Sequence, residues 1–176
     1  MKEQAVQEVP WDGEGPYFED FKPGMRIRSW PGRTFTENDN FCWLSLTGDC
    51  TPLYIDREYA RVAEFGDIII HPLIVLNAVL AMSVRDSSVN SLAFLKADYM
   101  RLHGTLRPGD TLYVETEVVE VRESRSRPEV GLVTWIHRGY NQRGELVCEI
   151  KRTNLVFKRD SSPWRRYLSE AKVGGA

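Results

Sequence analysis

The segment at residues 72–84 constrains the fold of this chain more than any other. Residues 73–76 and 78–82 are all apolar, so the segment is apolar on nearly every side of a helix. Thirteen residues exceed the length of a usual strand, and Pro72 suits the first turn of a helix. We therefore predict a helix that is buried, most simply inside a sheet that wraps around it.

From residue 91 onward the apolar residues recur with a period of two, which is the period of a strand. Leu112, Val114 and Val118, for example, alternate with other side chains. The pattern predicts strands at residues 91–101, 110–123, 130–140 and 145–158, with a hairpin turn at residues 141–144. Strands joined by hairpins around a single buried helix predict one α+β domain with a curved antiparallel sheet.

The first half of the chain predicts a strand and two shorter helices. The strand covers residues 25–35 and is interrupted at Pro31. Thr36, with an acid three residues later, predicts a helix start, and Gly48 predicts its end. One face of this helix carries Phe41, Leu44, Ser45 and Leu46. Asp56 predicts the cap of a second helix that ends near residues 65–66.

The composition divides the chain into a domain and two ends. Residues 1–20 are acidic and predict a flexible arm, with Trp11, Tyr17 and Phe18 as docking points. Residues 21–160 form the domain. Residues 161–176 are charged and end in glycines, which predicts a tail that is a peripheral helix or disordered.

Charge and hydropathy exclude two classes of partner. The 23 basic and 25 acidic residues give a net charge of −2, so we expect no binding to nucleic acid. No apolar run approaches the ~20 residues that cross a bilayer, so we expect no membrane span. The polar first residues lack the apolar core of a secretion signal, which predicts a cytoplasmic protein.

The cysteines and histidines indicate no metal and no disulfide set. Cys42, Cys50 and Cys148 are odd in number and lack paired spacing, so they predict free thiols in a reducing compartment. The three histidines are far apart in the sequence and give no metal signature. No glycine-rich phosphate loop is present, so we expect no flavin or nicotinamide cofactor.

Asp49 is the first candidate for chemistry, because it stands at a junction between a helix and a turn. Gly48 permits a backbone angle that other residues avoid, and Pro52 holds Thr51 in an extended conformation. A carboxylate at such a junction either acts on a ligand or caps nearby amides, and residue type alone leaves both open.

Four segments in order carry a resemblance to a known family: residues 18–24, 34–39, 47–60 and 107–112. In this respect the chain resembles the MaoC-like hydratases, whose motif is Gly-Asp-x-Asn-Pro-Leu-His. The resemblance implies the hotdog fold, a curved sheet around one helix. It covers roughly residues 18–159.

Two further segments, residues 122–131 and 139–142, look closest to the mesaconyl-CoA (2-methylfumaryl-CoA) hydratase branch of that family. In the family as a whole, an Asp and a His activate water for addition to an enoyl-CoA. A backbone amide at the start of the buried helix holds the thioester oxygen. The chemistry is general-base catalysis with oxyanion support.

The resemblance implies roles for three residues of this chain. Asp49 matches the catalytic Asp, so it is expected to activate water or orient it. Tyr54 stands where the motif has His; it either donates a proton or anchors water in a modified hydratase, or it only packs. His71 aligns with a second His of the family, and it either replaces the missing base or is a core residue.

The resemblance also implies contacts with the substrate. The family's Gly after the second His is Pro72, which has no amide hydrogen, so the amide of Leu73 is the expected oxyanion donor. Asn77 either faces the acyl pocket or makes a structural hydrogen bond. The further candidates are Thr51 and Pro52 in the motif, and Arg122, Arg125 and Arg127, which either contact CoA phosphates or are solvated.

The predicted function is that of an (R)-specific enoyl-CoA hydratase or dehydratase, a hydro-lyase with an atypical site. Its substrate would be a short acyl-CoA, branched and dicarboxylic chains included, without any added cofactor. The alternatives are an acyl-CoA thioesterase and a non-catalytic acyl-CoA-binding subunit of a heteromer. A lone curved sheet leaves edges exposed, so we expect a homodimer or a larger homo-oligomer.

Overall fold

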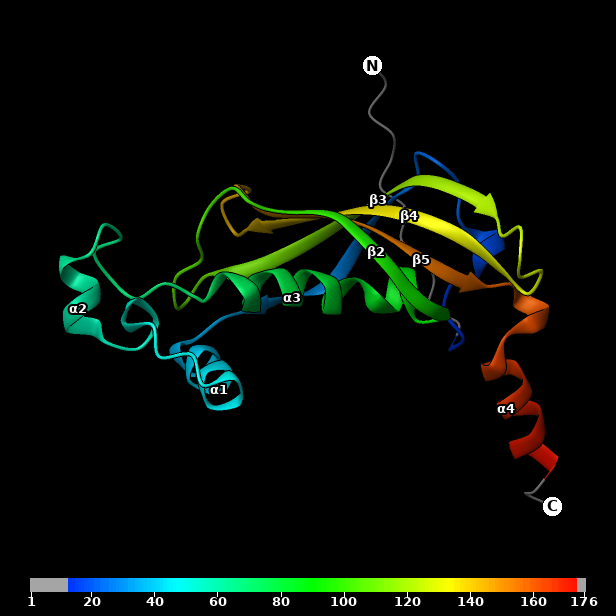
Figure 1. Cartoon of the computed structure of the whole chain (residues 1–176), viewed down its shortest axis with the longest axis horizontal. Helices are drawn as coiled ribbons and strands as arrows, with labels where there is room; N and C mark the ends of the chain where they lie inside the picture. Colours follow the sequence, from blue (N-terminus) through cyan, green and yellow to red (C-terminus); the bar gives the residue numbers. More distant parts are fainter. Residues whose placement is uncertain (1–12, 174–176) are drawn as a thin grey trace.

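A computed structural model describes residues 13–173 and shows one antiparallel sheet of five strands. The strands are β1 Arg26–Thr34, β2 Ser91–Leu102, β3 Thr111–Glu123, β4 Val130–Asn141 and β5 Leu146–Phe157. Their order across the sheet is β1-β3-β4-β5-β2. Helix α3, Pro72–Ser83, lies along the concave side of the sheet (Figure 1). The predicted α+β class and the four predicted strands of the second half are confirmed.

Helix α3 supplies the centre of the core, but it is not buried on every side. Its sheet-facing residues pack with apolar residues of β3 and β5 into one cluster. An exposed stripe runs along the opposite side and contains Leu73, Asn77, Ala81 and Val84. The prediction of a helix buried all round is therefore wrong for the single chain, because the sheet curves around only part of it. Asn77 lies in solvent and needs no structural hydrogen bond.

The end of α3 is fixed to the sheet by a feature that the sequence did not predict. The helix continues into a π-helical turn, Val84–Ser88. The buried guanidinium of Arg152 on β5 donates to Ser88 Oγ at 2.9 Å and, through Nε, to His137 Nε2 at 2.8 Å. These bonds anchor the helix end to two strands.

Helix α1, Glu37–Thr47, has the predicted ends. The amide of Thr36 donates to the Asp39 carboxylate at 2.8 Å, and Gly48 closes the helix with a φ of 73°. The apolar face of α1 is exposed, however, since Phe41 and Leu46 are 48% and 86% accessible. The buried residue of this helix is polar, Asn40.

Helix α2, Arg57–Val62, begins at the predicted cap, where the Tyr59 amide donates to the Asp56 carboxylate at 3.0 Å. It ends earlier than predicted, because the backbone becomes extended at Ala63, with a φ of −77° and a ψ of 165°. Across residues 13–173, no helix has the length and hydropathy needed to span a membrane.

The two ends of the chain differ from the prediction in one respect. Tyr17 and Phe18 are buried, so the flexible arm predicted for residues 1–20 does not extend that far. Trp11 lies outside the described residues. The tail forms helix α4, Pro163–Val173, at the opposite end of the molecule from α1 and α2 (Figure 1).

Candidate active site

Asp49 lies in the turn after α1 and has both carboxylate oxygens engaged. Its Oδ1 accepts hydrogen bonds from the Thr51 amide at 2.9 Å and the Thr51 hydroxyl at 2.7 Å. These bonds lower the pKa of the Asp49 carboxyl, and the contact with His71 lowers it further. The group is therefore a carboxylate at neutral pH. It retains partial exposure, with a quarter of its side chain accessible (26%).

His71 is brought to Asp49 from the residue before α3, 22 positions along the chain. The Leu73 amide donates to His71 Nδ1 at 3.1 Å, so the proton of the neutral ring lies on Nε2. That Nε2–H donates to Asp49 Oδ2 at 2.9 Å. Both ring nitrogens are occupied, so His71 orients the carboxylate, and Asp49 is the group with a lone pair left for a ligand.

Tyr54 packs on the histidine ring and separates the pair from a cavity. The rings of Tyr54 and His71 are 4.5 Å apart between centroids. The cavity has a volume of about 320 Å³ and is lined by Tyr54, Pro72, Val75, Leu102 and other mostly apolar residues. Asp49 and His71 border it at Tyr54 and do not line it.

The Tyr54 hydroxyl makes no hydrogen bond with any described residue and can therefore donate to a ligand. Burial raises the pKa of Tyr54, and the charge of Asp49 raises it further, so the phenol keeps its proton at neutral pH. This geometry suits a hydrogen-bond donor.

Asn40 holds the site together, and sequence reasoning missed it. Its amide nitrogen donates to the backbone carbonyls of Tyr54 at 3.0 Å and Ile69 at 2.9 Å. Its oxygen accepts from the His71 amide at 2.9 Å. A fully buried polar residue thus joins α1, the Tyr54 turn and the start of α3. The only signal in the sequence was a polar residue in a short helix, which has no specific meaning by itself.

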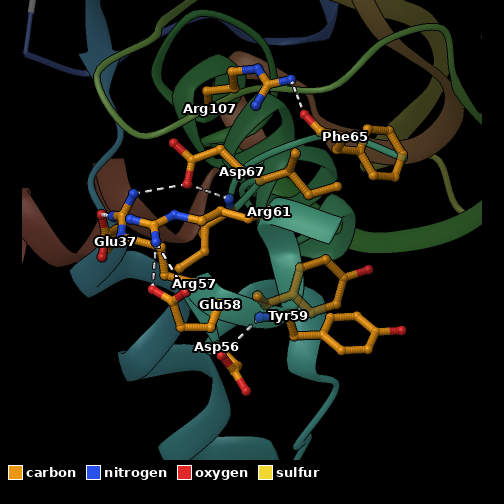
Figure 2. Close-up of polar contacts among 12 residues, drawn as sticks. Glu37, Asp56, Arg57, Glu58, Tyr59, Arg61, Phe65, Asp67 and Arg107 are labelled. Atoms are coloured by element: carbon orange, nitrogen blue, oxygen red, sulfur yellow. Dashed lines mark hydrogen bonds and ion pairs between the residues drawn. The ribbon is translucent and has the colours of Figure 1, made fainter. Parts of the chain in front are cut away.

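Ion pairs fasten the α2 region beside the cavity (Figure 2). Arg57 bridges Glu37 of α1 and Asp67, with 2.8 Å between its guanidinium and the Asp67 carboxylate. Arg107, before β3, donates to the carbonyl of Phe65 at 2.6 Å, and Phe65 lines the cavity. The cavity wall is therefore held both from α1 and from the loop before β3.

Only some of the other predicted substrate contacts lie near Asp49. Thr51 binds Asp49, and Pro52 is exposed in the same turn. The Leu73 amide is taken by His71 Nδ1 and is not free to hold a thioester oxygen. Asn77 does not line the cavity.

Arg122, Arg125 and Arg127 do not join the site within one chain. They are exposed at the turn between β3 and β4, at the end of the sheet where α4 lies (Figure 1). Asp49 and His71 lie at the other end, and β3 spans about 40 Å between the two at the usual rise per residue. The predicted contact with CoA phosphates is therefore not made at this chain's own site.

Comparison with known proteins places this chain in a family. A family model described as mesaconyl-CoA hydratase matches residues 3–164. The chain belongs to the mesaconyl-CoA hydratase family. Mesaconyl-CoA hydratase of Haloarcula marismortui is 31% identical over 148 residues, which are 84% of this chain and 41% of that protein. Beta-methylmalyl-CoA dehydratase of Chloroflexus aurantiacus is 33% identical over 147 residues, 83% of this chain and 41% of that protein.

A solved structure supports the same family. A putative MaoC domain protein dehydratase from Chloroflexus aurantiacus superposes with a TM-score of 0.81 and 31% identity, over 88% of this chain and 45% of that one. The resemblance to MaoC-like hotdog hydratases is thereby confirmed. The chain spans about two fifths of the length of these curated relatives.

Asp49 lies beside two residues of this site, Tyr54 and His71. Tyr54 occupies the motif's His position and has no basic nitrogen to offer. His71 comes from elsewhere in the chain and supplies a hydrogen bond to the carboxylate. The structure therefore brings an acid and a histidine together, although the motif segment of this chain contains no histidine. No group of three or more potential metal ligands occurs among residues 13–173.

Proposed function

We propose that this chain catalyses the reversible addition of water to a short enoyl-CoA thioester, branched and dicarboxylic acyl groups included. The observation that carries the proposal is the 2.9 Å contact between His71 Nε2 and Asp49 Oδ2 beside an apolar cavity. An ionised carboxylate that is held by a histidine can take a proton from water. The family assignment supports this reaction class, since relatives carry hydratase and dehydratase names.

In the proposed reaction, Asp49 takes one proton from a water molecule as the water oxygen bonds to C3 of the enoyl group. The C2=C3 π electrons move toward the thioester and give an enolate. The proton on Asp49 then moves to C2, the enolate collapses, and Asp49 is again a carboxylate. Water has been added across the bond without any other reactant. His71 orients the carboxyl group throughout by its contact with Oδ2.

Tyr54 is the proposed donor to the enolate oxygen. The usual backbone donor is missing here, because Pro72 has no amide hydrogen and the Leu73 amide bonds to His71. The phenol lines the cavity and keeps its proton, since burial and the Asp49 charge raise its pKa. A neutral donor aimed at developing negative charge is an effective form of oxyanion support.

For the CoA end of the substrate, Arg107 is a better candidate than the arginine turn. A second cavity of about 310 Å³, lined by polar residues that include Arg107, shares Gly104 and Thr105 with the apolar one. An acyl group in the apolar cavity would leave its CoA portion near this wall. We expect Arg107→Gln to raise KM for the acyl-CoA severalfold with little change in kcat.

The remaining expectations concern the setting in which the chain works. Cys42 and Cys50 are exposed free thiols and Cys148 is buried, which suits a reducing compartment. We propose a cytoplasmic protein that associates with itself and needs no cofactor.

To test this function, the purified chain is incubated with mesaconyl-CoA and with crotonyl-CoA, and two signals are recorded together. Loss of the conjugated double bond that Asp49→Asn abolishes would support the hydratase. Release of free CoA without loss of the double bond would instead identify a thioesterase. Binding of CoA with neither signal would overturn catalysis and indicate an acyl-CoA-binding subunit. The stereochemistry of the 3-hydroxyacyl product would test the (R)-specific assignment.

A further inference from the structure

The cavity beside Asp49 offers no charged group to a ligand. Its volume is about 320 Å³, and none of the described residues that line it is an acid, a lysine, an arginine or a histidine. Its most buried lining residues are no more than 4% exposed: Ile69, Ile70, Val75 and Leu106. All four are aliphatic, so the deepest part of the cavity suits a hydrocarbon group.

Two arginines in the segments around the cavity have partners outside it. Arg57 on α2 bridges Glu37 and Asp67 (Figure 2). Arg107 donates to the carbonyl of Phe65 at 2.6 Å and lines the neighbouring polar cavity. To pair with a negative charge inside the apolar cavity, either guanidinium would have to give up these bonds.

Asp49 adds a negative charge on the side from which water is added. Its hydrogen-bond partners among the described residues are the amide and hydroxyl of Thr51 and the neutral ring of His71. In the proposed reaction, the water held by Asp49 attacks C3 of the enoyl group. A second carboxylate on C3 would therefore lie one water molecule away from Asp49 without a cation to separate them. Like charges placed together in this way repel one another strongly.

We propose that this chain accepts an uncharged hydrocarbon acyl group and excludes acyl groups that carry a carboxylate on C3. The inference narrows the proposed function, and the position of C3 beside Asp49 rests on that function. Mesaconyl-CoA, which gives the relative from Haloarcula marismortui its name, has such a carboxylate. Replacing the carboxylate by a methyl group gives tiglyl-CoA (2-methylbut-2-enoyl-CoA). The cavity has room for about ten groups of ~30 Å³, so its size admits both acyl groups and charge distinguishes them.

Binding of unreactive analogues tests the exclusion without turnover. The probes are 2-methylbutanoyl-CoA and 2-methylsuccinyl-CoA, which differ by a methyl against a carboxylate on C3. By calorimetry, 2-methylbutanoyl-CoA should bind about 100-fold more tightly than free CoA, because its carbon atoms beyond the carbonyl become buried. 2-Methylsuccinyl-CoA should bind no more tightly than free CoA, and its methyl ester, which lacks the charge, should regain most of the affinity. Equal binding of the two probes, or no gain of 2-methylbutanoyl-CoA over free CoA, would overturn the inference.

Turnover separates this inference from the proposed function. Loss of the double bond should have a kcat/KM at least about 100-fold higher for tiglyl-CoA than for mesaconyl-CoA. Equal values for the two substrates would overturn the exclusion and leave the hydratase in place. Hydration of neither substrate, with 2-methylbutanoyl-CoA still bound in preference to 2-methylsuccinyl-CoA, would refute the proposed function and support an uncharged acyl ligand.

A cation placed in the cavity wall tests the cause of the exclusion. Thr105 lines the cavity and is exposed, so a longer side chain is tolerated there. Thr105→Lys should tighten the binding of 2-methylsuccinyl-CoA at least about tenfold relative to free CoA, because the ammonium group offsets the carboxylate. Thr105→Met is the matched control, with a long side chain and no charge, and should give no such gain. If the two variants change binding equally, charge does not exclude the carboxylate and the inference fails.

Discussion

Asn40 offers the sharpest test of how the site is held together. The substitution Asn40→Ala would leave two carbonyls, of Tyr54 and Ile69, and the amide of His71 without partners at a position with 0% exposure. An unpaired buried polar group costs about 1–3 kcal/mol. The space left is polar on three sides and can admit a water molecule, so the low end applies to each group. The expected loss in free energy of unfolding is about 3 kcal/mol.

Urea denaturation measures this loss directly. With a slope of roughly 2 kcal/mol per molar, a loss of about 3 kcal/mol lowers the urea midpoint by about 1.5 M. The control is Asn38→Ala on the same helix, where the side chain is exposed and its one contact is a 3.6 Å approach to a sulfur. That variant should stay within about 0.5 kcal/mol of the parent. If Asn40→Ala shifts the midpoint no more than Asn38→Ala does, the three hydrogen bonds of Asn40 make no net contribution to stability.

The same variant has a consequence for the site. Without the bond to Asn40, the backbone of His71 is free to move, and the hydrogen bond from its Nε2 to Asp49 weakens. Turnover should fall at least tenfold under native conditions, while KM changes less, because the cavity wall is held separately by Arg57 and Arg107.

Three further predictions concern separate parts of the molecule. Burial and the adjacent Arg152 charge hold the pKa of His137 well below 6.5, so the unfolded chain binds a proton that the folded chain excludes. Stability should therefore fall by about 1.4 kcal/mol per pH unit as the pH drops below 6.5, and His137→Gln should flatten that slope in urea titrations between pH 6.5 and 5. In Gly131→Ala the new methyl would lie 2.0 Å from the Phe18 ring, and the overpacking should cost about 1–3 kcal/mol by thermal or urea unfolding; an unchanged midpoint would show that the ring moves freely. Tyr54→Phe keeps the ring on His71 and removes the donor, so kcat for hydration should fall about 100-fold; an unchanged kcat would leave Tyr54 a packing role only.

The fold was predictable because its signals are local and periodic. The switch from an apolar helix at residues 72–84 to period-two strands after residue 91 needs no knowledge of tertiary contacts. The caps at Thr36 and Asp56 likewise depend on residues within one turn. Local chemistry therefore located the helices and strands to within a few residues.

The site was less predictable because its contacts join distant segments. Asp49 could be recognised at a helix-to-turn junction, but its pairing with His71 depends on how the chain folds back over a separation of 22 positions. Asn40 was invisible for the same reason, since its three partners lie on other segments. The position of the arginine turn relative to Asp49 could not be predicted, because sequence order says nothing about which end of a long strand lies near the site.

The departures from the family motif make sense as one rearrangement. Pro72 removes an amide hydrogen at the start of α3, and the next free amide, that of Leu73, bonds to His71 Nδ1. That bond fixes the proton of the neutral imidazole on Nε2, which then faces Asp49. Tyr54 packs against the ring at 4.5 Å and holds it in this orientation, and its hydroxyl remains free to donate. Together, these contacts pair one histidine with the Asp49 carboxylate and leave the Tyr54 hydroxyl free for a ligand.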